Sequence, residues 1–254
     1  MRRALLLALA VVLPAAPARA EPPEQALRVD IASSYSSLSH NLPPWRETSA
    51  VLTYRPDASV WISGGIEHSV RFGLEDDVAS LRLVRTLRRG AAVWADLALS
   101  PGADFRAISS IHAGATFAPM LELPGEWQLA PGIEGVVSRY RIGDVQSLQP
   151  SIALSNARGV SLSTRLIETW DESRHRLTGY ALRAGAPIGN RAQIGLGYAD
   201  APESDAGKTI KTKAVSGWAS FDLDASTSLR VTATRETRSS FNRNEIALGL
   251  ARRF

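Results

Sequence analysis

The chain contains no cysteine, and beyond its first 20 residues it has no long uninterrupted apolar run. The absence of cysteine excludes disulfide bonds, thiolate metal sites and catalysis by a cysteine nucleophile. No stretch approaches the roughly 18 apolar residues that a membrane-spanning helix needs. Helical periodicity is scarce as well. A chain with these absences must be held together by an ordinary core or by a closed, hydrogen-bonded sheet.

Residues 1–20 have the three parts of a secretory signal peptide. Met1-Arg2-Arg3 is basic, residues 4–13 are apolar, and Ala18-Arg19-Ala20 is a cleavage site of small residues. We expect cleavage after Ala20, so that residues 21–254 form one exported domain. A buried N-terminal helix is the alternative, but it would not explain the tripartite pattern.

Net charge is small once this peptide is removed. The full chain has 29 basic and 25 acidic residues, and Arg2, Arg3 and Arg19 fall within residues 1–20. The mature chain would therefore carry 26 basic residues against 25 acidic ones. It has no stripe of Lys and Arg with interleaved aromatic residues, so we expect no nucleic-acid partner.

What the sequence does have is a period-2 alternation of apolar and polar residues along almost its whole length. In residues 242–254, Ile246, Leu248 and Leu250 lie on the same face as the terminal Phe254, and the other face carries small or polar residues. Successive side chains of a strand point to opposite sides, so such a strand can face lipid on one side and water on the other. Residues 242–254 are therefore expected to form one strand in the wall of a membrane barrel.

Runs of this kind recur with turn signals between them. They predict about 14 strands, and merging two weak hairpins would give about 12. Both counts are even and fall within the range of bacterial outer-membrane barrels. The predicted strands occupy residues 27–36, 46–55, 60–67, 79–87, 91–99, 111–117, 127–137, 148–154, 160–166, 177–184 and 192–198, a long run ending at 223, and residues 229–233 and 242–254.

The predicted fold class is all-β: a closed antiparallel up-and-down transmembrane β-barrel in the cell outer membrane. Closure requires the last strand, residues 242–254, to pair with the first, residues 27–36, because an open sheet edge cannot face lipid. A soluble β-sandwich of the lipocalin or jelly-roll type would also alternate. It would explain neither a C-terminal phenylalanine nor aromatic residues gathered at the strand ends.

The connections and the aromatic residues predict how this barrel sits in the membrane. If the chain starts on the periplasmic side, the odd-numbered connections face outward, and most are longer than the even-numbered ones, as outer loops usually are. They are residues 37–45, 68–77, 100–107, 139–145, 169–174, 200–209 and 237–242. Aromatic residues at strand ends predict two girdles, one at each membrane interface. The girdle at the outer interface would contain Trp45, Tyr140, Trp170 and Tyr198, and the girdle at the periplasmic interface would contain Trp61, Phe117, Trp127, Phe221 and Phe254. Arg252 is expected to reach the periplasmic headgroups beside Phe254.

Several short motifs resemble the YaiO family of outer-membrane β-barrels. They are Tyr35-Ser36-Ser37-Leu38-Ser39 followed by Trp45, then Arg71-Phe72-Gly73 with Asp76 or Asp77 after it, and Ser100-Pro101-Gly102-Ala103-Asp104-Phe105. The resemblance covers essentially the whole mature chain. It implies an outer-membrane barrel with a suspected connection to exopolysaccharide or surface-glycan systems, and it carries no catalytic residues. Arg252 departs from the usual pattern, which places an apolar or aromatic residue two before the last.

The alternation also selects polar residues that should point into the lumen. A charge inside a barrel must be paired or hydrated. Such residues could therefore line a narrow polar channel, or they could lock the lumen shut as a network of ion pairs. The candidates are Glu67, Arg82, Asp96, Glu134, Arg165 and Glu245.

Catalytic and metal-binding patterns are weak. His68-Ser69 beside Glu67 suggests a hydrolase, but neighbouring side chains of a strand point to opposite faces, so His68 could not act as the base for Ser69. Glu75, Asp76 and Asp77 could bind a divalent cation, although such a cluster is more often a solvated loop. We expect no enzymatic activity, cofactor or metal.

The sequence therefore favours a non-enzymatic barrel with a structural or conduit role, linked to the export or assembly of surface polysaccharide. The alternatives are a small-solute, porin-like channel and an outer-membrane lipid or glycan hydrolase. The expected partners are outer-membrane lipid and lipopolysaccharide, a surface glycan, and the barrel-insertion machinery, which would recognise the C-terminal strand ending at Phe254.

Overall fold

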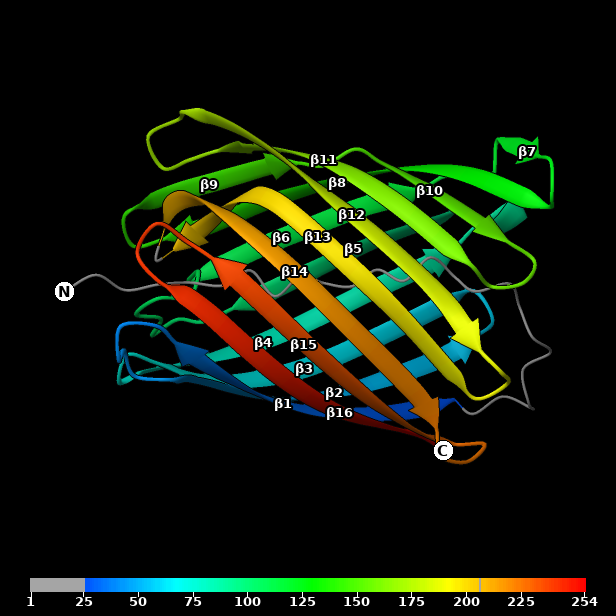
Figure 1. Ribbon diagram of the computed structural model, residues 1–254, viewed down its shortest axis with the longest axis horizontal. Coiled ribbons are helices and arrows are strands. Elements are labelled where there is room, and N and C mark those ends of the chain that lie inside the picture. The colour runs from blue at the N-terminus through cyan, green and yellow to red at the C-terminus, as the bar shows by residue number, and fades with distance from the viewer. Residues whose placement is uncertain (1–25, 206) are drawn as a thin grey trace.

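The computed structural model describes residues 26–205 and 207–254, which form one closed β-barrel (Figure 1). The predicted signal peptide, residues 1–20, lies outside the described residues. Among the described residues, no helix is long and apolar enough to cross a membrane. Within the same residues, one short 3-10 turn, η1 (Arg88–Gly90), lies between two strands.

The strands follow one another as antiparallel neighbours around the barrel. They are β1 (Leu27–Leu38), β2 (Trp45–Asp57), β3 (Val60–Arg71), β4 (Leu74–Thr86), β5 (Ala92–Leu99), β6 (Ser109–Thr116), β7 (Leu121–Leu123), β8 (Trp127–Tyr140), β9 (Gly143–Leu148), β10 (Ser151–Asn156), β11 (Ser161–Trp170), β12 (Arg176–Ile188), β13 (Ala192–Asp205), β14 (Lys208–Asp222), β15 (Thr227–Thr237) and β16 (Asn242–Arg253).

These segments make a barrel of 14 strands, as predicted. β9 and β10 both lie between β8 and β11, so they are two halves of one barrel strand. Pro150 separates them, because proline has no N–H with which to continue the ladder. β7 pairs with β8 just beyond β6 and on the same side, so β6 and β7 also share one position in the wall.

The last strand closes the barrel against the first. β16 pairs with β1 over the whole length of both strands, from Arg28 opposite Arg253 to Leu38 opposite Arg243. Beyond the ladder, the N–H of Phe254 donates to the carbonyl oxygen of Leu27 at 2.8 Å. The predicted closure is therefore confirmed.

The distribution of side chains is the reverse of that in a soluble protein. The outer face carries exposed apolar residues, such as Ile66 and Leu196, each 68% exposed. In β16, Ile246, Leu248 and Leu250 are all exposed on this face, as the alternation predicts. Charged and hydroxyl side chains instead dominate the buried set. Such an outer surface is compatible with hydrocarbon and costly in water.

The barrel has two distinct ends. We call the end that holds Leu27 and Phe254 the terminal rim, and the opposite end the far rim (Figure 1). The predicted long loops at 68–77, 139–145 and 200–209 are wrong, because strands fill most of each range. β3 and β4, for example, are joined at the far rim by Phe72-Gly73 alone. These strand ends lack an apolar outer face, so their sequence resembles that of a loop.

The aromatic girdles are confirmed in part. Phe117, Phe221 and Phe254 are exposed on the outer face near the terminal rim. Arg252 also lies at this rim, with its guanidinium carbon 5.3 Å from the ring centroid of Phe254. Trp45 and Tyr140 were expected in the outer girdle, but both are buried inside the far rim. Trp45 points inward because it pairs with Ser36, whose side chain is already on the inner face.

Candidate functional site

A cavity of about 540 Å³ occupies the lumen. Small side chains on β1 and β16, such as Ala32 and Ala247, leave room on one part of the wall, and Glu134 and Arg165 face the cavity from β8 and β11. A barrel of 14 strands is wider than one of eight strands, whose interior side chains fill the lumen completely. The size of the cavity is therefore set by inward side chains and by loops rather than by the width of the sheet.

Four of the six predicted lumen residues form a row across one wall. The Nε of Arg82 lies 3.4 Å from Oδ1 of Asp96, and Oδ2 of Asp96 lies 3.7 Å from Nδ1 of His112. The other ring nitrogen of His112 contacts Oε1 of Glu134. Arg165 completes the row with its Nη1 3.2 Å from the same Glu134 oxygen.

This row lies along the wall and does not cross the lumen. Arg82, Asp96 and His112 come from neighbouring strands in direct register, so their contacts follow the ladder. Arg165 also donates to Oε1 of Gln149 at 3.0 Å, beside the break between β9 and β10. Each charge in the row therefore has a partner of opposite sign or a polar partner, as charges removed from bulk water require.

The far end of the lumen is filled by a second and larger cluster, which we call the far plug. At its centre is Trp45, whose ring makes edge contacts with Phe72 and Phe241 at centroid distances of 5.5 and 5.6 Å. The guanidinium carbons of Arg71 and Arg238 lie 4.7 and 5.5 Å from the same ring centroid. The far plug consists of Trp45, Glu47, Glu67, Arg71, Phe72, Phe105, Arg106, Glu203, Glu236, Arg238, Phe241, Arg243 and Glu245.

Four arginines and five glutamates of the far plug pair with one another. Arg238 donates to Glu203 at 2.8 Å and also contacts Glu236. Arg243 joins Glu236 to Glu245, with a nitrogen 2.8 Å from each carboxylate. The side chain of Arg238 is completely buried, and those of Arg243 and Glu236 are 3% exposed. Water therefore does not reach the centre of this network.

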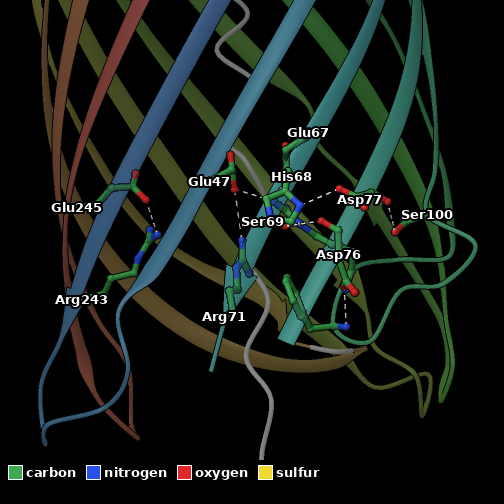
Figure 2. A network of polar contacts seen from close by, with 12 residues as sticks. Glu47, Glu67, His68, Ser69, Arg71, Asp76, Asp77, Ser100, Arg243 and Glu245 are labelled. Atoms are coloured by element: carbon green, nitrogen blue, oxygen red, sulfur yellow. Dashed lines mark hydrogen bonds and ion pairs between the residues drawn. The ribbon is translucent and has the colours of Figure 1, made fainter. Parts of the chain in front are cut away.

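Residues 100–108 contribute Phe105 and Arg106 to the far plug. Figure 2 shows Ser100, where this segment begins, and Asp76 near it. The carboxylate of Asp76 holds this loop by accepting three backbone N–H groups, from Asp104 at 2.6 Å, Phe105 at 2.9 Å and Arg106 at 2.7 Å. The guanidinium of Arg106 then reaches Glu47, at 2.6 Å, and Glu67. Asp76 is thus a buried anchor for the loop and not part of a solvated acidic cluster.

Contacts across the far rim complete the closure. Phe105 packs on Tyr140 and Val145 of β8 and β9. The turn between β13 and β14 touches the same place, because a side-chain carbon added at Gly207 would lie only 2.7 Å from Cβ of Tyr140. An open, water-filled mouth would leave such inward side chains exposed, whereas Phe105 and Tyr140 are buried. The described residues therefore narrow the far rim.

The predicted lumen residues thus fall into two groups. Arg82, Asp96, Glu134 and Arg165 belong to the wall row, and Glu67 and Glu245 belong to the far plug. Sequence reasoning missed most of the plug. Arg71, Arg106, Glu203 and Arg238 lie in ranges that were expected to be loops, whereas Glu47 and Arg243 lie near the ends of predicted strands. One available signal was parity: continuing the inward positions of β3 from Glu67 leads through Ser69 to Arg71. The missed charged residues are Glu47, Arg71, Arg106, Glu203, Glu236, Arg238 and Arg243.

The suspected hydrolase pair is separated by the wall of the barrel (Figure 2). His68 is half-exposed on the outer side, where its Nδ1 lies 2.8 Å from Oδ1 of Asp77. Ser69 is fully buried on the inner side, and its hydroxyl donates to the carbonyl oxygen of Asp76 at 3.3 Å. His68 therefore cannot take a proton from Ser69. Within residues 26–205 and 207–254, no group of three His, Asp or Glu could hold a metal ion.

Two inward tryptophans lie flat against glycines of neighbouring strands. A side-chain carbon added at Gly114 would lie 2.6 Å from the ring of Trp94, and one added at Gly195 would lie 2.4 Å from the ring of Trp218. Glycine at these positions therefore makes room for an indole within the wall. Arg82, paired with Asp96, covers Trp94 at 5.0 Å from the ring centroid.

Solved structures show the same fold. The chain is similar to the outer-membrane protein Omp33 of Acinetobacter baumannii, with 11% identity, a TM-score of 0.58, and coverage of 91% of this chain and 100% of that one. It is also similar to the CymD monoaromatic hydrocarbon channel, with 10% identity, a TM-score of 0.52, and coverage of 90% and 88%. For the NanC porin the identity is 10%, the TM-score 0.52, and the coverage 89% and 100%.

The closed barrel, the apolar outer surface and these likenesses together identify the chain as an outer-membrane β-barrel. No model of a known protein family matches the chain, and no curated protein sequence matches it. Membership of the YaiO family therefore remains a prediction.

Proposed function

We propose that this barrel is a gated channel for small solutes, whose far mouth is closed in part by a removable loop, residues 100–108. The observation that carries the proposal is the cavity of about 540 Å³ in the lumen of a 14-stranded barrel, whose lining includes charged residues such as Glu134 and Arg165. A purely structural barrel would not need such a cavity, whereas a channel does. The likenesses to CymD and NanC are likenesses of fold, and they agree with this function without carrying it.

The closure of the far mouth depends on a loop and not only on the wall. Residues 100–108 lie between β5 and β6, and Asp76 on β4 is their main anchor. A loop can leave the lumen without breaking the barrel ladder, because the ladder hydrogen bonds belong to the strands. Release of this loop would withdraw Phe105 and Arg106 from the far plug and open a path past Tyr140.

Substitution of Asp76 by asparagine should favour the open state. Oδ1 of Asp76 accepts the N–H group of Asp104 and Oδ2 accepts those of Phe105 and Arg106, so in either orientation the amide nitrogen of asparagine would face at least one N–H donor. Hydrogen bonds to a charged group are worth about 1.5–3 kcal/mol, so the ratio of open to closed channels should rise about 10- to 100-fold. The measurement is single-channel recording in planar bilayers, where the wild type should open rarely and Asp76→Asn often.

Asp77→Asn is the matched control. Asp77 is the next residue, but its side chain is on the outer face and is 85% exposed, so this change should leave gating as it is in the wild type. Absence of stepwise conductance from both the wild type and Asp76→Asn would refute the channel. Equal effects of the two substitutions would refute the role given to Asp76.

Membership of the YaiO family and a role in the export or assembly of surface polysaccharide belong to this proposal as its second, more specific part. A glycan chain could pass only if residues 100–108 left the lumen and the strand-borne side chains of the far plug also moved apart. The same recordings therefore bear on both parts, since a conduit for a polymer requires a larger open state than a small-solute channel.

A further inference from the structure

Among the described residues, two arginines of the lumen wall have no acidic partner. Arg183 on β12 and Arg230 on β15 both face the cavity. In the part of the chain that the structure describes, neither guanidinium makes a hydrogen bond or an ion pair. This contrasts with the arginines of the far plug and with Arg82 and Arg165, each of which lies against a carboxylate.

Trp218 fixes the two arginines on one stretch of wall. Their guanidinium carbons lie 5.5 Å and 5.3 Å from the centroid of its ring, which is itself pressed on Gly195. Contact with an aromatic ring attracts a cation, but it does not neutralise the charge. Both arginines are only half-buried, so a solute in the lumen can reach them.

The floor around the arginines is made of small residues. Gly197 on β13, Ser216 on β14 and Gly249 on β16 also line the cavity and leave open space beside the guanidinium groups. The total volume of about 540 Å³ is within the range of sites for small molecules, roughly 300–1,000 Å³. The site is therefore large enough for an organic solute as well as for a simple ion.

Charge is distributed unevenly around the lumen. Asp96 and Glu134, on the wall formed by β5 and β8, are already compensated by Arg82, His112 and Arg165. The wall formed by β12–β15 carries two uncompensated positive charges, and arginine stays charged because its pKa is too high for it to lose its proton in a protein. A planar guanidinium matches the oxygens of a carboxylate or phosphate, which it can bind through two parallel hydrogen bonds.

We propose that Arg183, Arg230 and Trp218 form a binding site for small organic solutes that carry a carboxylate or phosphate group. The site names the class of solute that the proposed channel would carry. Only its role in transport rests on the proposed function. Binding itself does not require the far mouth to open, because Arg183 and Arg230 lie outside the far plug.

Equilibrium binding tests the site separately from conduction. Folded protein in detergent micelles is titrated by calorimetry with glucuronate, glucose 6-phosphate and glucose, which share a sugar ring and differ in charge. We expect one or both charged sugars to bind and glucose not to bind at the same concentrations. The charged sugar that binds more strongly identifies the preferred anionic group, and added salt should weaken its binding.

Substitutions then assign the binding to the two arginines. Arg183→Gln and Arg230→Gln should each lower the affinity for the charged sugar by about tenfold, and the double variant should show no measurable binding. Arg235→Gln is the control, because Arg235 is on the same strand as Arg230 but is exposed on the outer face. Arg235→Gln should bind the charged sugar like the wild type. A difference in electrophoretic migration between unheated and heated samples shows that each variant is folded.

Equal binding of glucose, no binding of either charged sugar, or wild-type affinity in the folded double variant would each overturn the proposed site. The two proposals fail separately. Charged sugars that bind to a barrel silent in bilayers would support the site and refute the channel. A conducting barrel without such binding would support the channel and refute the site.

Discussion

Arg238→Met should lower the free energy of unfolding of the barrel by about 3–5 kcal/mol, the usual cost of removing one partner from a buried ion pair. Arg238 joins Glu203 on β13 to Glu236 on β15, and its side chain is completely buried. Methionine would fill much of the same space, but it would leave the buried carboxylate of Glu203 without its ion-pair partner and Glu236 with Arg243 alone. The measurement is equilibrium unfolding in denaturant, with the protein in lipid or detergent.

An ion pair whose arginine is exposed provides the control. Arg176 donates to Glu168 at 2.5 Å, and Thr178 also donates to this carboxylate, so Glu168 keeps a partner when Arg176 is removed. The side chain of Arg176 is 65% exposed, and such surface pairs contribute only about 0–1 kcal/mol. Arg176→Met should therefore change stability little. A loss below about 1 kcal/mol in Arg238→Met, or equal losses in the two variants, would show that the far plug contributes little to the stability of the barrel.

The architecture could be predicted from the sequence because lipid leaves a regular pattern on a strand. Every second residue of β16 that meets lipid is apolar, from Ile246 to Leu250, and the same pattern in the other runs predicts 14 strands. The pairing of β16 with β1 followed from the same physics, since a sheet edge cannot remain open in hydrocarbon. Neither inference required knowledge of distant contacts.

The far rim could not be predicted in this way, because its strands continue past the apolar band. β3 ends at Arg71 and β4 begins at Leu74, yet the polar residues on both sides of that turn were interpreted as a loop. Trp45 was placed in the outer girdle because aromatic residues gather at interfaces. Its real direction depends on its pairing with Ser36, which a single strand does not reveal.

The candidate site, too, could be predicted from the sequence only in part. Parity along a strand selects residues such as Glu134 and Arg165, which the structure brings to 3.2 Å. The partners within the far plug come from segments far apart in the chain, and Asp76 holds a loop that begins more than twenty residues later. Arg183 and Arg230 stand out only when every other arginine on the inner wall has been matched with its acid.

Gly195→Ala should destabilise the barrel by about 1–3 kcal/mol, the usual cost of overpacking. The added carbon would lie 2.4 Å from Cε2 and Nε1 of Trp218 and 2.6 Å from the carbonyl oxygen of Ala184. The indole would have to leave the wall, and Arg183 and Arg230 would lose the ring that they share. Unfolding in denaturant should show the loss of stability, and calorimetry with the charged sugars should show weaker binding.

Gly64→Ala is the matched control, because no heavy atom lies within 4 Å of a carbon added there. It should be neutral or slightly stabilising, since alanine loses less backbone freedom on folding than glycine. A double-variant cycle then isolates the clash with the indole. If Trp218 is the obstacle, Gly195→Ala should cost less in a Trp218→Ala background, with a coupling of about 0.5–3 kcal/mol. An unchanged cost would assign the strain to the Ala184 backbone instead, and it would show that Gly195 does not position the indole of Trp218.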